Sequence, residues 1–148
     1  MPLHLIKLCV GIDQIAQLAQ LQERRLQALV ADGQPPLLSH VTRMAPRRAE
    51  ELLAGGSLYW VIRGQIQARQ RLCAIDRFTD ADGVGRCALM LDPALVPTVA
   101  QPRRPFQGWR YFKPEDAPAD FDQAVQNSGN EDDMPSEMRA ELAALGLL

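Results

Sequence analysis

The stretch SLYWVIRGQIQARQRLCAIDRF, residues 57–78, decides the fold of this chain. Residues 58–63 are rich in aromatic and β-branched side chains, which favour extended strands. Gly64 then allows a turn or a bulge, and residues 65–78 alternate polar and apolar side chains at the period of a strand. We therefore expect two consecutive strands that form a hairpin around Gly64, the second of them long.

The sequence on the C-terminal side of this hairpin continues with strand patterns. A loop at residues 79–83 leads into residues 86–91, which are expected to pair back onto the long strand. Pro93 and Pro97 break the next apolar piece. The aromatic segment FQGWRYF, residues 106–112, is expected to close the folded part.

Two helices and two further strands are expected on the N-terminal side. Residues 3–10 favour a strand, and Asp13 caps a helix that runs to Ala31. Residues 38–44 read as a short strand, and residues 47–54 as a second helix that ends at the glycine pair 55–56. The apolar stripe of the first helix consists of Ile15, Leu18, Ala19, Leu26, Leu29 and Val30.

This order of elements predicts an α+β fold. Five short strands with little helix between them favour a small mixed or antiparallel curved sheet or barrel, with two or three flanking helices, over a doubly wound fold. Residues 1–113 form the expected domain. The segment 114–136 is acidic and contains prolines, which is typical of a linker or a disordered segment. Residues 137–148 are expected to form a short C-terminal helix.

The composition is that of an ordinary globular domain, since the 148 residues are 47% hydrophobic and 23% charged. No apolar run approaches the roughly 20 residues that span a bilayer, and the N-terminus lacks a signal-peptide pattern. We therefore expect a cytoplasmic protein without membrane contact. The three cysteines are widely separated, and no phosphate loop or dinucleotide fingerprint is present, so neither a metal site nor a cofactor is expected.

Charge is distributed unevenly along the chain. Residues 40–113 carry twelve positive and six negative side chains, whereas residues 114–148 carry one positive and nine negative ones. A basic body followed by an acidic tail indicates that the body binds an anion, or that the tail contacts the basic face or a partner.

Strand alternation places Arg69 and Arg71 next to each other on one face of the long strand, together with Gln65 and Gln67. Planar guanidinium groups suit phosphate or carboxylate oxygens, which they engage with paired hydrogen bonds. A solvated outer face of an antiparallel sheet explains the same pattern equally well. Arg63, at the end of the preceding strand, is expected to join Arg69 across the hairpin.

A second cluster, RRPFQGWRYFK at residues 103–113, interleaves cations with aromatic rings. Such interleaving is typical of nucleic-acid binding, in which bases stack on rings and phosphates meet positive charge. The rings could instead belong to the core, whereas the arginines are harder to explain in that way. The expected ligand-binding residues are Arg43, Arg63, Arg69, Arg71, Trp109 and Arg110, and the further candidates are His40, Gln67, Arg103, Arg104 and Tyr111.

Three runs of the sequence resemble a bacterial family catalogued as domain of unknown function 1489. They are HVTRMAPRRAEELLAGGSLYWVIRGQIQARQRL (residues 40–72), LDPALVPT (91–98) and RRPFQGWRYFKPEDAP (103–118), and the resemblance covers about residues 3–120. This resemblance implies a recognisable unit but no activity.

A second resemblance is to the PUA-like barrels of the ASCH group, in which a helix leads into a strand with the pattern G-x-K-x-x-E-x-R. Gly56 and Arg63 match the first and last positions, but Leu58 and Val61 replace the lysine and the glutamate. The resemblance implies a cleft for RNA or a nucleoside-like ligand. The missing lysine argues against the hydrolytic activity of some members.

We expect a non-catalytic binding domain for RNA or another phosphorylated, nucleotide-like ligand. One alternative is an enzyme on a small anionic substrate, with Arg63, Arg69 and Arg71 as an anion clamp and His40 as a general base. The other alternative is a protein-interaction module. A pocket that joins His40 to those arginines would favour the enzyme.

Overall fold

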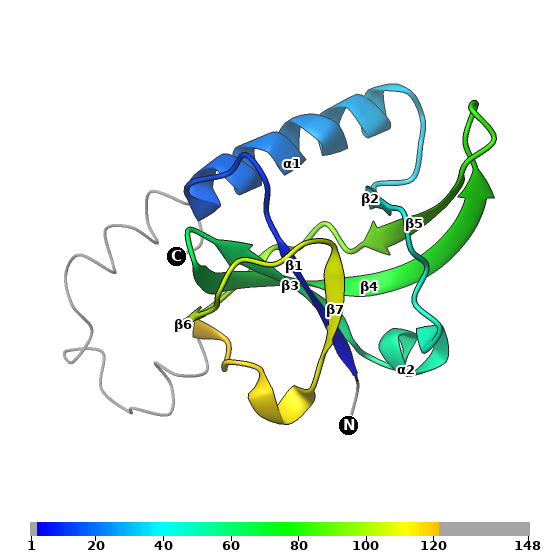
Figure 1. Ribbon diagram of the computed structural model, residues 1–148. Coiled ribbons are helices and arrows are strands. Elements are labelled where there is room, and N and C mark those ends of the chain that lie inside the picture. The colour runs from blue at the N-terminus through cyan, green and yellow to red at the C-terminus, as the bar shows by residue number, and fades with distance from the viewer. Residues whose placement is uncertain (1–2, 122–148) are drawn as a thin grey trace.

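The stretch that decides the fold forms the hairpin at the centre of a sheet (Figure 1). In the computed structural model, which describes residues 3–121, strands β3 (Ser57–Ile62) and β4 (Gln65–Thr79) pair antiparallel. The two residues between them, Arg63 and Gly64, both have positive φ, 52° and 74°. This is the backbone of the two-residue turns that match the twist of a hairpin, and it explains the glycine.

Seven strands form one mixed sheet, which confirms the predicted α+β class with a curved sheet. Their order is β2-β5-β4-β3-β1-β7, and β6 also pairs with β4. Within residues 3–121, β1 and β3 run parallel, and all other strand pairs are antiparallel. The remaining elements are β1 (His4–Leu8), α1 (Ile15–Ala31), β2 (Leu38–Thr42), α2 (Ala49–Leu53), β5 (Gly85–Leu91), β6 (Val96–Pro102), β7 (Trp109–Phe112) and a 3-10 helix, η1 (Pro114–Asp116).

Strand β4 is long enough to serve three neighbours. Its N-terminal half has β3 on one edge and β6 on the other, and its C-terminal half pairs with β5. The amide of Leu72 donates to Gly56 O at the β3 edge (3.0 Å), whereas Arg71 O accepts from Asp92 N–H at the opposite edge (2.9 Å). The segment that contains β5 and β6 therefore follows one edge of β4 along its whole length.

Bulges in β4 break the simple alternation that the sequence predicts. The pairing register shifts between Ile66 and Ala68 and again between Leu72 and Ala74. As a result, Ile66 packs in a different cluster from Ala68 and Leu72, although strict alternation would place all three on one face. The Gln67 amide donates to Ile62 O (2.8 Å) and thereby supports the backbone at the first bulge.

Strand β6 was not expected, because Pro93 and Pro97 were read as breaks. The structure places Pro97 opposite Ala68 and Pro102 opposite Gln65 in an antiparallel pairing whose register shifts between these two positions. A proline removes one donor, which a strand with only one long partner tolerates.

Helix α1 covers one face of the sheet (Figure 1), where Ile15 and Leu18 pack against Trp60 and the other buried residues of that face. It begins with a capping box between Gln14 and Gln17, and not with Asp13 as cap. Ile15 and Leu18 are buried as expected, but Val30, expected on the apolar stripe, is 64% exposed. The third buried residue of α1 is polar: Gln22.

Gln22 is satisfied by a network inside the core. Its amide and that of Gln70 exchange two hydrogen bonds of 2.7 and 2.9 Å, and Gln70 Oε1 also accepts from Trp60 Nε1 (2.9 Å). Gln70 is fully buried and also donates to Asp92 O (3.1 Å). A buried amide with every partner in place fixes how α1 sits on β3 and β4.

The described part of the chain includes residues 114–121 of the expected linker. Residues 114–121 run beside β6: Val99 N–H donates to Ala119 O (2.9 Å), Thr98 and Asp120 form a β-bridge, and Phe121 is buried. This segment, residues 114–121, is called the strap below. The rest of the expected linker and the expected C-terminal helix lie outside the described residues.

The sheet does not close into a barrel, because β2 and β7 remain as its two edges. Gly56 sits at a close approach of backbones: a Cβ there would lie 2.2 Å from Leu3 O and 2.4 Å from Leu52 O. Packing therefore suffices to explain this glycine of the ASCH-like pattern. Neither helix within residues 3–121 has the length and apolar character needed to cross a membrane.

Candidate functional site

The two edge strands of the sheet are linked by aromatic side chains. Trp109 on β7 donates its indole N–H to Met44 O, just after β2 (2.8 Å). The Tyr111 hydroxyl accepts from the amides of Arg47 and Arg48 (2.9 and 3.1 Å). These amides belong to the two residues that precede α2, and Arg48 provides no side-chain cap, so Tyr111 anchors the chain where the helix begins.

A groove of about 950 Å³ lies where these edges face each other. Five cations line it, and they come from separate parts of the sequence: Lys7, Arg43, Arg86, Arg103 and Arg110. No carboxylate contributes to the wall within residues 3–121. We call this surface the basic groove.

The basic groove also has an apolar component. Trp109 and Tyr111 lie in its wall with ring centroids 5.0 Å apart, and Val41 and Met44 are 48% and 71% exposed beside them. Exposed apolar side chains next to cations make a surface that suits a flat, partly apolar group carrying negative charge.

Two of the arginines are held by an aromatic ring. The guanidinium carbons of Arg110 and Arg103 lie 5.4 and 5.6 Å from the centroid of Phe106. Contact with a ring face restricts a guanidinium without using its N–H donors. Arg86, by contrast, pairs with Asp80 (2.8 Å), so its charge is already partly neutralised.

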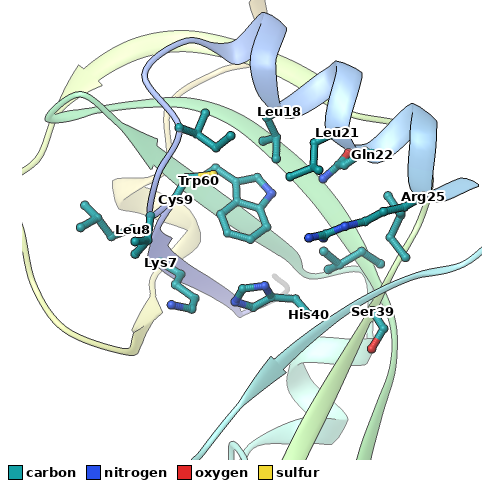
Figure 2. Close-up of a pocket in the computed structure, with 14 residues that line it drawn as sticks. Lys7, Leu8, Cys9, Leu18, Leu21, Gln22, Arg25, Ser39, His40 and Trp60 are labelled. Atoms are coloured by element: carbon teal, nitrogen blue, oxygen red, sulfur yellow. The ribbon is translucent and has the colours of Figure 1, made fainter.

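A second, smaller pocket adjoins the basic groove through Lys7, which lines both. This inner pocket of about 150 Å³ lies between α1, the end of β1 and β2 (Figure 2). Figure 2 shows the rings of His40 and Trp60 in its wall and the Arg25 side chain reaching in from α1. The two rings are perpendicular, with centroids 5.2 Å apart.

His40 carries an unpartnered atom in this wall. Its Nε2 is buried and has no hydrogen-bond partner within the described chain. Burial lowers the pKa of His40 to about 4, and the charges of Lys7 and Arg25 act in the same direction. His40 is therefore a neutral imidazole at physiological pH.

Arg69, the centre of the expected ligand-binding face, is already occupied. Its guanidinium forms two hydrogen bonds with the carboxylate of Asp120 in the strap, both 2.7 Å, and a third with Ser57 Oγ (3.0 Å). The bond to Asp120 raises the pKa of Arg69. Arg69 therefore holds the acidic segment on the sheet, which explains why strand alternation found a cation there.

The structure brings some predicted residues together and separates others. Arg43, Arg103, Trp109, Arg110 and Tyr111 all line the basic groove, and His40 lines the inner pocket. Arg63 is at the hairpin turn, Gln67 supports a bulge, and Arg71 and Arg104 are exposed outside both cavities. Neither cavity contains Arg63, Arg69 or Arg71, so the expected clamp around His40 is not assembled.

Lys7, Arg25 and Arg86 were not predicted as site residues. Lys7 occurs in an apolar strand, Arg25 in the first helix, and Arg86 in a hairpin strand. No local sequence pattern marks these three residues, because only the tertiary structure brings them to the two cavities.

Metal ligation has no support within residues 3–121, where no three His, Cys, Asp or Glu side chains gather in a suitable cluster. Cys9 lines the inner pocket, but burial raises the pKa of its thiol to about 11. A protonated thiol is neither a good metal ligand nor a good nucleophile.

Comparison with known proteins gives one match. A family model described as "Protein of unknown function (DUF1489)" matches residues 5–148. No curated protein and no solved structure matches the chain.

Proposed function

Since the chain belongs to this family of unknown function, we propose from the geometry that the basic groove binds a nucleotide unit of single-stranded RNA. The phosphates contact Arg43, Arg110 and their neighbours, and a base packs on Trp109. A free phosphorylated nucleotide shares this chemistry and is the other source of such a ligand.

The observation that supports the proposal is the convergence of five cations on one groove without a carboxylate in its described wall. Like charges gathered in this way repel one another, so an anionic ligand would reduce the electrostatic repulsion among them. Exposed cations of a merely solvated surface are normally interspersed with acidic groups.

The apolar side of the groove supports a nucleotide rather than a bare phosphate. An inorganic anion gains nothing from Trp109, Val41 or Met44, whereas a base gains about 1–3 kcal/mol from stacking on an aromatic side chain. The groove volume of about 950 Å³ is at the upper end of ordinary ligand sites. It therefore offers room for more than one small anion.

The shape of the site favours a single strand. The cations and Trp109 line a hollow between sheet edges, whereas a duplex keeps its bases stacked inside and is contacted mainly through its backbone and grooves. Only an unpaired nucleotide presents its base and its phosphate to such a hollow together.

The test is fluorescence anisotropy with the full chain and a labelled eight-residue oligouridylate at low salt. The double variant R43M/R110M removes two cations of the groove and should weaken binding about 30-fold or more, taking roughly 1 kcal/mol for each charge-assisted contact. The matched variant R24M/R71M removes two exposed arginines outside the groove and should bind within about threefold of the parent.

Equal losses in both double variants would show that only net charge matters and would reject the groove. Uridine monophosphate, used as competitor, separates the two sources of ligand. Displacement at micromolar concentrations would indicate a nucleotide site, and displacement only by longer oligonucleotides would indicate RNA.

A further inference from the structure

We propose that the inner pocket is a separate binding site for a short-chain monocarboxylate, an acid of about six non-hydrogen atoms such as isobutyrate. This site goes beyond nucleotide binding, because Arg25, His40 and Trp60 do not line the basic groove. Lys7 is the residue that the two cavities share.

The polar end of the inner pocket is built for an anion. Lys7 and Arg25 both line it, and no Asp or Glu does so within the described chain. Figure 2 shows the two cations approaching from different elements, Lys7 from β1 and Arg25 from α1, with His40 between them. A carboxylate placed there would meet opposite charge from two directions.

The orphaned nitrogen of His40 is an independent indication. A buried polar atom without a partner is unfavourable and is rarely left so without a reason. Since His40 is neutral and flanked by cations, its useful role toward an anion is to donate from Nε2. A carboxylate oxygen drawn between Lys7 and Arg25 would provide the missing acceptor.

The other walls of the inner pocket are apolar, which excludes a fully hydrated anion such as inorganic phosphate. Ile12, Leu18, Leu21 and Leu38 surround the space next to Trp60. The side-chain amides of Gln22 and Gln70 and the indole N–H of Trp60 bond one another, so these groups do not require a polar ligand. A short alkyl group is the chemistry that such a wall accepts.

The size of the ligand follows from the cavity. A protein cavity of about 150 Å³ accommodates a molecule the size of benzene, which has six non-hydrogen atoms. Isobutyrate has the same number and combines a carboxylate with a branched alkyl group. Octanoate is too large for a volume of about 150 Å³.

The experiment is an NMR titration of the ¹⁵N-labelled full chain, followed at the indole N–H of Trp60. Isobutyrate should give a saturable shift in the millimolar range or tighter, because six atoms can supply only modest affinity. Its neutral isostere isobutyramide and inorganic phosphate should each bind at least tenfold more weakly. Octanoate should bind no better than isobutyrate.

Two neighbouring residues of α1 provide the matched variants. R25M should weaken isobutyrate at least tenfold, whereas R24M, with the same loss of charge outside the pocket, should leave it unchanged. Both side chains are exposed on the helix, so neither substitution threatens the fold.

The proposal is wrong if isobutyrate gives no saturable shift up to about 100 mM, a concentration at which even a weak site of this size would fill. It is also wrong if isobutyramide or phosphate binds equally well, if affinity keeps rising to octanoate, or if R24M and R25M behave alike. None of these outcomes depends on oligouridylate, so the two proposals fail or stand independently.

Discussion

Replacing Asp120 by asparagine should destabilise the whole fold, because this carboxylate anchors the strap to the sheet. Its two hydrogen bonds to Arg69 are 2.7 Å long, and the side chains of Arg69 and Asp120 are only 26% and 17% exposed. Asparagine keeps the shape of the side chain but loses the charge and one of the two acceptors.

The magnitude lies between two known limits. Exposed ion pairs contribute about 0–1 kcal/mol, and breaking a fully buried pair costs about 3–5 kcal/mol. With most of both side chains covered, D120N should lower the free energy of unfolding by about 2 kcal/mol, within the range for hydrogen bonds to charged groups. D116N, which alters an exposed carboxylate of η1, should change it by less than about 0.5 kcal/mol.

The assay is urea denaturation of the full chain, followed by tryptophan fluorescence, within a double-mutant cycle that adds R69M and D120N/R69M. The coupling energy between the two positions should be about 1.5–2.5 kcal/mol. If the effects of R69M and D120N on the free energy of unfolding are additive, or if D120N is as stable as D116N, the Arg69–Asp120 ion pair does not anchor the strap. Arg69 would then be available to a ligand, as the sequence had suggested.

Three further predictions concern stability. Q70L leaves Gln22 and the Trp60 indole without their buried partner and should lower the free energy of unfolding by about 2–4 kcal/mol. The double variant Q22L/Q70L should lose less than the sum of the losses in Q22L and Q70L. Urea denaturation of the three variants checks this. Y111F removes the acceptor for the two amides that precede α2 and should cost about 1–2 kcal/mol. Hydrogen exchange of the Arg48 amide should be accelerated relative to that of β4, and unchanged exchange would contradict the anchoring role of Tyr111. The pKa of His40 is about 4 in the folded protein against an ordinary value of 6.5, so the unfolded chain takes up this proton first as the pH falls. The free energy of unfolding should therefore be constant above about pH 6.5 and drop by up to about 3 kcal/mol toward pH 4. H40Q should remove most of that drop, and a wild-type profile flat down to pH 4 would show that His40 is not buried.

The elements that local patterns encode were predictable from the sequence. The hairpin of residues 57–78, helix α1 and the mixed α+β class all follow from side-chain periodicity and from Gly64. The missed strand β6 shows the limit of the rule on prolines, since Pro97 and Pro102 both pair with β4.

The candidate site was predictable only in part. The segment 103–113 supplied Arg103, Trp109 and Arg110 because cations and rings alternate there, and all three line the basic groove. The ion pair of Arg69 was not predictable, because its partner, Asp120, lies 51 residues away in the acidic segment. The bulges of β4 and the approach of β7 to β2 are tertiary features, so periodicity within one strand could not reveal them.

The salt dependence of oligouridylate binding tests the central claim most directly. Lys7, Arg43, Arg103 and Arg110 have no ion-pair partner within residues 3–121, so two to four phosphates should be neutralised. The logarithm of the association constant should then fall against the logarithm of salt with a slope of about −1.4 to −2.8, and R43M/R110M should reduce that slope by about 1.4. A slope near zero, or one that the double variant leaves unchanged, would contradict binding in the basic groove.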